Sequence, residues 1–250
     1  MWKIIPLDVG TLYVTRSTQL ARHGAKFDVG RIVAEPCIVW LLTNLDTGRV
    51  ILVDTGPGED TEWASVQHNP LQCAPEQRLS AVLAKYNLNC EDIDTVILTH
   101  LHWDHAYGAL HLPNAKLYVQ KEELRYAVAP LPSDRRVYEN QLGDDIPYFL
   151  KLYNQYVFLD GDSVFDNGLE IITLPGHSPG SQGVVVDTKK GKYIIAGDLI
   201  SIKEGWDLRI PCGLYTNMED CYRSFAKMES YDAIVLGGHD YAPFELFKDK

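Results

Sequence analysis

Short apolar runs separated by polar turns follow one another along most of this chain. The runs at residues 38–43 and 50–54 are rich in β-branched and aliphatic residues, and a short polar stretch with a glycine lies between them. This pattern is typical of two strands joined by a turn and predicts a hairpin. Residues 95–99 form another short β-branched run, which predicts a buried strand that ends at His100.

Other segments predict more strands and three helices. Residues 75–86 begin with a proline and then carry apolar residues at helical spacing, which predicts a helix. Two more helices are predicted at residues 121–129 and 218–228. The remaining strands are predicted at residues 116–119, 156–159, 169–174, 183–186, 193–196 and 233–236. Strands with interspersed helices indicate a mixed α/β protein whose helices pack on sheet faces, although periodicity does not give the strand order.

Two segments, residues 59–74 and 130–147, show no clear periodicity. Loops of this length are uncommon unless they cover a site or move. We favour simple surface excursions, and lids over a functional site are the alternative. No repeat, low-complexity stretch or Gly/Ser linker divides the sequence, so we expect a single domain over residues 1–250.

Charge and cysteine content narrow the class of partner. The 23 Lys+Arg and 34 Asp+Glu residues give a formal net charge of −11, and no basic cluster offsets it. This balance argues against nucleic acid or an anionic membrane as partner. The five cysteines are scattered without a CxxC pair, so neither a disulfide framework nor a thiolate zinc site is indicated. No signal peptide or membrane-spanning run is evident, so we expect a cytoplasmic protein and leave a homodimer open.

Histidine and aspartate are concentrated in one short segment, Thr99-His100-Leu101-His102-Trp103-Asp104-His105. His100 and His102 are two residues apart, so on an extended chain they point the same way. Asp104 and His105 come after the chain turns and can face a neighbouring point. Neutral imidazole and carboxylate ligands favour zinc, and they also suit iron, manganese or nickel. A solvated histidine-rich loop is the alternative interpretation.

Three later segments repeat the pattern of a metal-ligating residue type beside glycine at the end of a predicted strand. They carry His177 in Pro-Gly-His-Ser-Pro-Gly, Asp198 in Ala-Gly-Asp, and His239 in Gly-Gly-His. Each alone is a weak signal, because a single histidine or aspartate at a strand end is more often structural. Together with the first segment they supply seven ligands, enough for two metal ions with three terminal ligands each and one shared carboxylate.

These motifs, with Val53-Asp54-Thr55-Gly56 upstream, resemble the metallo-β-lactamase superfamily of hydrolases in order and separation from about residue 35 to 240. The resemblance implies an α/β fold, the four-layer αββα sandwich, with two metal ions at one sheet edge. It also implies that Asp198 bridges the ions and that the terminal ligands are His100, His102 and His177 for the first and Asp104, His105 and His239 for the second.

Within the superfamily, His-Leu-His-Trp-Asp-His-Ala-Tyr-Gly and Pro-Gly-His-Ser-Pro-Gly-Ser are most similar to the N-acyl-homoserine lactonases. In those enzymes a tyrosine that touches the substrate carbonyl lies three residues after the bridging aspartate. Ser201 occupies that position here. Either Tyr107 or Tyr215 has taken over the role, or the substrate differs. Trp103, between two ligands, either walls the substrate pocket or fills the core.

Two divalent ions about 3.5–4 Å apart lower the pKa of a bridging water, and the resulting hydroxide attacks a polarised carbonyl. We expect Asp104 and Asp198 to be the catalytic carboxylates, with Asp104 or the second ion assisting departure of the leaving oxygen. The predicted reaction is hydrolysis of a lactone, with a thioester, a phosphotriester or another ester as alternative substrate. A metal-binding protein without activity is the hypothesis from a different class.

Two further expectations concern residues near this set. Asp54 ends a predicted buried strand, where it either orients a ligand histidine or caps a turn. His23, His68 and His111 have no ligand-like setting, so we expect them to be exposed.

Overall fold

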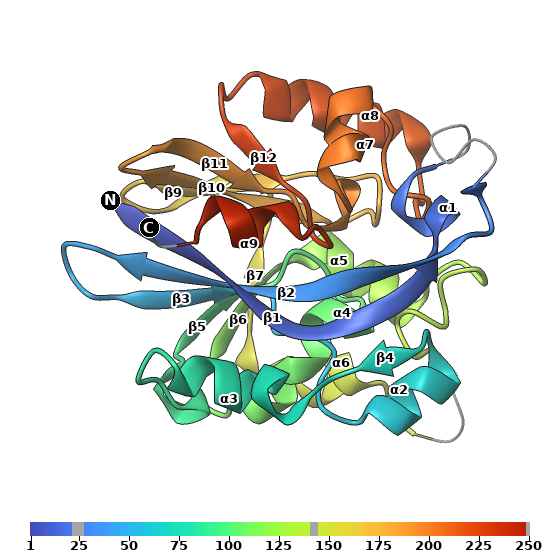
Figure 1. Ribbon diagram of the computed structural model, residues 1–250, viewed down its shortest axis with the longest axis horizontal. Coiled ribbons are helices and arrows are strands. Elements are labelled where there is room, and N and C mark those ends of the chain that lie inside the picture. The colour runs from blue at the N-terminus through green and yellow to red at the C-terminus, as the bar shows by residue number, and fades with distance from the viewer. Residues whose placement is uncertain (22–27, 141–144, 249–250) are drawn as a thin grey trace.

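The strands of the protein build two sheets that pack face to face, with helices outside them (Figure 1). The structure, a computed structural model, describes residues 1–21, 28–140 and 145–248. Among these residues, no helix has the length and apolar character that a membrane span requires.

The first sheet begins antiparallel and ends parallel. Its strand order is β1–β2–β3–β5–β6–β7, and every pairing from β3 to β7 is parallel. The short strand β4 (Leu71–Gln72) pairs with the far part of β1. The bounds of the other strands are Trp2–Thr15 for β1, Ile32–Asn44 for β2, Val50–Val53 for β3, Thr95–Ile97 for β5, Lys116–Gln120 for β6 and Tyr156–Leu159 for β7.

The second sheet is antiparallel from β8 to β11, and β12 then pairs parallel with β11. The two sheets meet at one edge, where Trp2 of β1 pairs with Thr188 of β10. The bounds are Ser163–Asp166 for β8, Leu169–Thr173 for β9, Gln182–Thr188 for β10, Gly191–Ile195 for β11 and Ile234–Leu236 for β12.

Three separate apolar cores define four layers. Successive strand side chains point to opposite faces, so β2 sends Trp40 into the core between the sheets and Leu41 into the core under the helices of the first sheet. On the second sheet, Val184 of β10 faces the first sheet, and Val185 packs with Phe225 of helix α8 in the third core. The architecture is therefore the predicted α/β sandwich with the layer order αββα.

The helices are short apart from α8 (Met218–Glu229), which begins at Asn217, whose side chain accepts hydrogen bonds from the backbone N–H groups of Glu219 and Asp220. The other α-helices are α1 (Arg16–Gln19), α2 (Thr61–Gln67), α3 (Leu79–Ala84), α4 (Trp103–Ala106), α5 (Lys121–Val128), α6 (Tyr148–Lys151), α7 (Lys203–Leu208) and α9 (Ala242–Leu246). The 3₁₀ helices are η2 (Pro75–Gln77), η3 (Cys90–Asp92), η4 (Tyr107–His111), η5 (Tyr153–Gln155) and η6 (Gly197–Leu199).

Most predicted elements are present. The predicted hairpin is β2 and β3, paired from Trp40↔Val53 to Thr43↔Val50. The predicted helix at residues 75–86 is divided into η2 and α3, because Arg78 between them has an extended backbone with ψ 141°. The first strand, β1, was not predicted. It contains Pro6 and Gly10, and its pairing with β2 shifts register between Asp8 and Thr11, so its alternation is interrupted.

The two unassigned segments differ from each other. Residues 59–74 contain α2 and β4, whereas the described part of residues 130–147 consists mainly of turns, and residues 141–144 lie outside the described residues. The expectation that His68 is exposed is wrong, because its ring is buried and stacks on Trp103 at 4.2 Å between ring centroids. His111 is exposed as expected, and His23 lies outside the described residues.

Candidate metal centre

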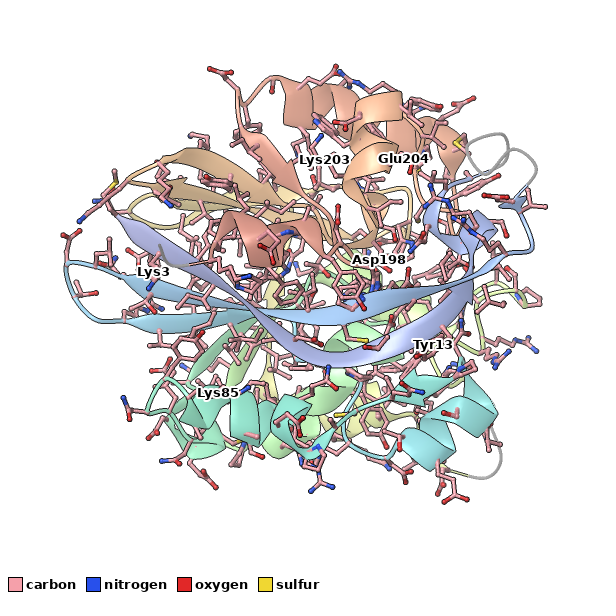
Figure 2. All side chains as sticks on the ribbon, in the orientation of Figure 1. Lys3, Tyr13, Lys85, Asp198, Lys203 and Glu204 are labelled. Atoms are coloured by element: carbon pink, nitrogen blue, oxygen red, sulfur yellow. The ribbon has the colours of Figure 1, made fainter. Side chains whose placement is uncertain are left out.

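The seven predicted ligands all follow strands that end at the same edge of the sandwich. The loop after β5 carries His100 and His102, and the short helix α4 carries Asp104 and His105. The other three, His177, Asp198 and His239, follow β9, β11 and β12 respectively. Figure 2 shows Asp198 inside the molecule, with Lys203 above it on α7. The fold therefore joins residues separated by up to 139 positions, from His100 to His239.

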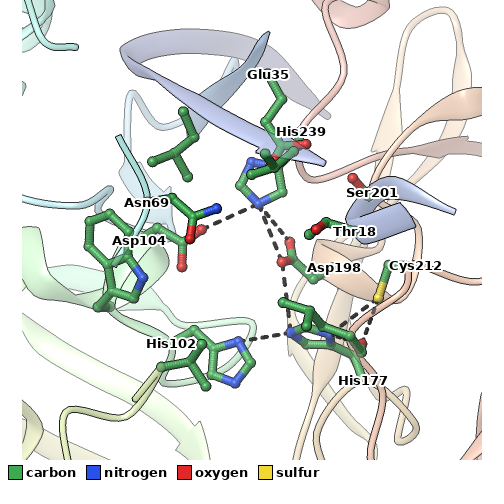
Figure 3. Close-up of a pocket in the computed structure, with 15 residues that line it drawn as sticks. Thr18, Glu35, Asn69, His102, Asp104, His177, Asp198, Ser201, Cys212 and His239 are labelled. Atoms are coloured by element: carbon green, nitrogen blue, oxygen red, sulfur yellow. Dashed lines mark hydrogen bonds and ion pairs between the residues drawn. The ribbon is translucent and has the colours of Figure 1, made fainter. Parts of the chain in front are cut away.

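The first group consists of His100, His102 and His177, all buried, with one nitrogen of each turned toward the others. His177 Nε2 lies 3.1 Å from His100 Nε2 and 3.0 Å from His102 Nδ1 (Figure 3 shows the latter). A tetrahedral zinc ion with bonds of about 2.0–2.1 Å holds its nitrogen ligands about 3.3 Å apart. The spacing therefore fits three imidazole ligands on one ion.

In two of these rings, the Nδ1 proton is donated to a group outside the predicted metal site. His177 Nδ1 donates to the carbonyl of Leu214 at 2.6 Å. The hydroxyl of Thr99 donates to Asp54 at 2.8 Å and accepts from His100 Nδ1 at 3.0 Å. Each ring, when neutral, therefore presents an unprotonated Nε2, and two lone pairs facing each other at 3.1 Å fit a cation between them.

The second group consists of Asp104, His105, Asp198 and His239. Asp198 Oδ1 lies 3.0 Å from His105 Nε2 and 3.2 Å from His239 Nε2. Both rings donate their Nδ1 proton away from the group, His105 to Asp54 at 2.9 Å and His239 to the carbonyl of Pro36 at 2.9 Å. Asp198 Oδ1 is accordingly buried without a hydrogen-bond donor among the described residues. This orphaned oxygen between two nitrogens whose rings already donate from Nδ1 fits a divalent metal ion, which would take the rings as neutral ligands.

Asp198 lies between the two groups. Its Oδ1 faces His105 and His239. Its Oδ2 lies 3.3 Å from His239 Nε2 and 3.7 Å from His177 Nε2 of the first group, so it is turned toward both groups (Figure 3). Asp104 Oδ2 is 3.5 Å from His239 Nε2, on the other side of the second group. This arrangement suits one carboxylate shared by two ions and a second carboxylate on one of them.

The electrostatics of the two groups differ. Burial, with neighbouring imidazoles, lowers the pKa of His100 and His102, so these rings are neutral ligands. Burial alone would also lower the pKa of His239, but the carboxylates of Asp198 and Glu35 outweigh it and raise that pKa to about 10. The second group thus attracts positive charge, which a metal ion supplies with the rings unprotonated.

Asp54 accepts hydrogen bonds both from the backbone just before His100 and from the predicted ligand His105. Its Oδ1 accepts from the backbone N–H of Thr99 at 2.7 Å, and its Oδ2 accepts from His105 Nδ1 at 2.9 Å. The residue has a positive φ of 60°, a conformation that costs energy for a side chain other than glycine. Asp54 therefore accepts the Nδ1 proton of a predicted ligand histidine, and its role in orienting that ring stays a prediction.

Glu123 on α5 was missed by the sequence reasoning, because it lies in a helix rich in charged residues. It is fully buried, and its Oε1 accepts from the backbone N–H of Leu101 at 2.9 Å and from the hydroxyl of Tyr138 at 2.8 Å. Its Oε2 accepts from the hydroxyl of Ser178 at 2.5 Å. Leu101 separates His100 from His102 and Ser178 follows His177, so one carboxylate ties together the two loops of the first group.

A narrow cavity of about 60 Å³ opens beside the ligands. Trp103 lines it, and so does Ser201, at the position where the lactonases have their tyrosine. The unassigned segments contribute one wall residue each, Asn69 and Val137. The remaining side chains of the wall, besides the ligands His102, Asp104, His177, Asp198 and His239, are Leu12, Val14, Thr18, Glu35, Cys212 and Leu214.

The structure does not place the two candidate tyrosines on this wall. Tyr107 packs between Trp63 and Tyr148, with ring centroids at 5.5 Å and 5.0 Å. Tyr215 packs against the third core. Neither ring is therefore in the position expected of a substitute for the lactonase tyrosine, and the hydroxyl of Ser201 is the group that faces the cavity there.

Comparison with known proteins identifies the family of this chain. The model of the metallo-beta-lactamase superfamily matches residues 33–239, which is more than half of the chain. The chain therefore belongs to this superfamily. The match spans all seven predicted ligands.

Two curated relatives are N-acyl homoserine lactonases. The N-acyl homoserine lactonase of Bacillus cereus is 29% identical over 204 residues, 76% of either chain. The N-acyl homoserine lactonase AttM of Rhizobium radiobacter is 30% identical over 168 residues, 63% of this chain and 62% of AttM, so that match spans less than two thirds of the relative. The expected lactonase-like hydrolase is confirmed, and the protein is an enzyme of the metal-dependent hydrolase class.

Two solved structures share the fold. An N-acyl homoserine lactone hydrolase with the product N-hexanoyl-L-homoserine at its catalytic metal centre superposes with a TM-score of 0.79 at 21% identity, covering 98% of this chain and 95% of the other. AidC, a dizinc quorum-quenching lactonase, superposes with a TM-score of 0.74 at 18% identity, covering 97% of this chain and 88% of AidC. At these identities the two structures establish the αββα fold and nothing finer.

Proposed function

We propose that this protein hydrolyses lactones at a centre of two divalent metal ions, with zinc as the first candidate metal and an N-acyl-homoserine lactone as the first candidate substrate. The observation that carries the proposal is Asp198 Oδ1, buried without a hydrogen-bond partner among the described residues and facing the Nε2 atoms of His105 and His239, whose Nδ1 atoms donate to other groups. The relatives that act on these lactones, and the dizinc lactonase with the same fold, support the choice of substrate and metal.

The residues that would hold the metals are those of the two groups. His100, His102 and His177 would bind the first ion, Asp104, His105 and His239 the second, and Asp198 both. Bound ions of this kind polarise a carbonyl and lower the pKa of a water molecule.

The chain's own residues then position the lactone and transfer a proton to its leaving oxygen. Asp104 lines the cavity beside the second group, where its carboxylate can take the proton that the attacking water loses and pass it to the leaving oxygen of the lactone. Ser201 offers a hydroxyl to the substrate carbonyl with a shorter reach than tyrosine. Trp103, Val137 and Leu214 form apolar wall that excludes water from the reacting group.

A substrate panel tests this proposal. Protein loaded with zinc is assayed on N-acyl-homoserine lactones, simple γ-lactones, thioesters and aryl phosphotriesters. We expect hydrolysis of the lactones, loss of that activity on chelation, and its return with added zinc. Activity confined to thioesters or phosphotriesters would show that the substrate is not a lactone. Tight metal binding without any activity would show that the protein is a metal-binding protein and not an enzyme. Cytoplasmic location and a homodimer stay predictions.

A further inference from the structure

Glu35 is a carboxylate on an otherwise apolar strand face. In the pairing of β1 with β2, Glu35 stands opposite Leu12 and Val33 opposite Val14. Residues two apart on a strand share a face, so Glu35 lies with these three apolar side chains and, like Leu12 and Val14, lines the cavity of the metal centre. Only 3% of Glu35 is exposed. Burying a carboxylate is costly, and a leucine would pack on this face without that cost.

No Lys or Arg side chain pairs with the carboxylate of Glu35 in the described part of the chain, and a charged group that its field reaches is the ring of the predicted ligand His239. Its Oε2 accepts a hydrogen bond of 3.0 Å from Gln19 Nε2, and Gln19 in turn accepts one of 2.8 Å from Arg16. The guanidinium of Arg16 pairs instead with Glu204 at the start of α7 (Figure 2). The neutral amide of Gln19 therefore fixes the direction of the carboxylate without neutralising it.

Glu35 is also not one of the residues grouped as metal ligands. It belongs to the wall that a bound substrate would touch, as Figure 3 shows with Asn69 and His239 around the same cavity. A carboxylate that is held in place by a single amide donor and lines a cavity can accept a further hydrogen bond from a donor that arrives with the ligand.

From this we propose that Glu35 determines substrate specificity by accepting a hydrogen bond from an N–H group, amide or ammonium, next to the scissile carbonyl. The inference rests on the proposed function and narrows its substrate class to nitrogen-substituted lactones. A substrate without the N–H group leaves the dehydrated carboxylate with Gln19 as its one donor in the complex, so the cavity discriminates against it. Apolar neighbours such as Leu12 and Val14 strengthen this effect by excluding water.

The test compares matched substrates across matched variants. An N-acyl-homoserine lactone carries an amide N–H, homoserine lactone carries an ammonium group, and a γ-alkyl lactone carries neither. We expect Glu35→Leu to lower kcat/KM for the two nitrogen-bearing lactones by about tenfold relative to the alkyl lactone, mainly through KM, as the loss of one hydrogen bond to a charged acceptor implies. Glu35→Gln, which keeps an acceptor and loses the charge, should affect the ammonium substrate most.

Controls separate specificity from damage to the fold or the metal centre. Glu122→Gln, at an exposed position of α5, should leave all three rates unchanged. Zinc content and the thermal midpoint of each variant show whether the site and fold persist. If the ratio of kcat/KM between the nitrogen-bearing lactones and the alkyl lactone is unchanged in Glu35→Leu, with zinc retained, the proposed role of Glu35 is wrong while lactone hydrolysis stands. Absence of activity on every lactone in the wild type would instead overturn the proposed function.

Discussion

Asp198 Oδ1 lies 3.0 Å from His105 Nε2, and because His105 Nδ1 donates to Asp54, neither of the two facing atoms carries a hydrogen when the ring is neutral. Two acceptors at this distance repel each other in a buried site. The contact is stable only with a cation between the atoms or with a proton on the imidazole, and carboxylates around His105 raise its pKa against the effect of burial. The site is thus organised around positive charge.

Replacing Asp198 by asparagine should weaken both metal sites together. The residue faces both groups, and a neutral amide cannot bridge two cations as a carboxylate does. We expect the zinc bound per chain, measured by elemental analysis after dialysis, to fall toward zero rather than from two to one. Asp160→Asn, at an exposed aspartate paired with Lys121, is the control and should keep its metal. A variant that lacks one ion only would contradict the shared carboxylate.

His105→Ala should empty the second site and spare the first. The substitution removes a nitrogen that faces Asp198 and His239, but none of the three imidazoles of the first group. We expect one ion per chain and a loss of activity of at least about a hundredfold, because even residues that only orient metal ligands cost 10–100-fold. Equal metal content and rate in the variant and the wild type would show that His105 is not a ligand.

The ligand set could be predicted from the sequence because its chemistry is local. Three histidines and an aspartate in one short segment, and glycine beside His177, Asp198 and His239, show in the residue types themselves which positions can bind a metal. Their convergence could be inferred only from the family resemblance. Strand order and the pairing of distant segments depend on long-range contacts, and the hydrophobic periodicity of the sequence does not reveal these.

The supporting residues could not be predicted, for physical reasons that differ from one to the next. In the sequence, Glu123 has the pattern of a residue on a polar helix face. Its burial could not be predicted, because it depends on hydrogen-bond donors from other segments, Leu101, Tyr138 and Ser178. Glu35 lies before the part of β2 that the pattern identified. His68 was expected to be exposed because its partners come from other elements.

Glu123→Gln tests whether this buried carboxylate positions the first group. The amide keeps the shape but can no longer accept all three hydrogen bonds, so the loops of His100 and His177 lose a common anchor. We expect zinc affinity, measured by competition with a chromophoric chelator, to fall by about 10–100-fold. The neighbouring exposed Glu122→Gln is the matched control. Wild-type affinity together with a lower thermal midpoint would mean that Glu123 serves the fold alone.

The buried pair of His68 and Glu139, 3.3 Å apart between Nε2 and Oε1, should make the stability of the fold depend on pH. Burial raises the pKa of Glu139 to about 8 and lowers that of His68 to about 4. A raised carboxyl pKa favours the folded state at low pH and loses that contribution as the pH rises through about 8, whereas a lowered histidine pKa adds stability as the pH rises from about 4 to 6.5.

The two effects oppose each other between about pH 4.5 and 6.5, so their sum is a loss of stability between about pH 6.5 and 8. Thermal midpoints of zinc-loaded protein across this range should fall in the wild type. Glu139→Gln removes the titrating carboxyl, so its curve should be flatter there, since a glutamine amide does not ionise. Parallel curves for the two proteins would show that the Glu139 carboxyl is ionised throughout this range.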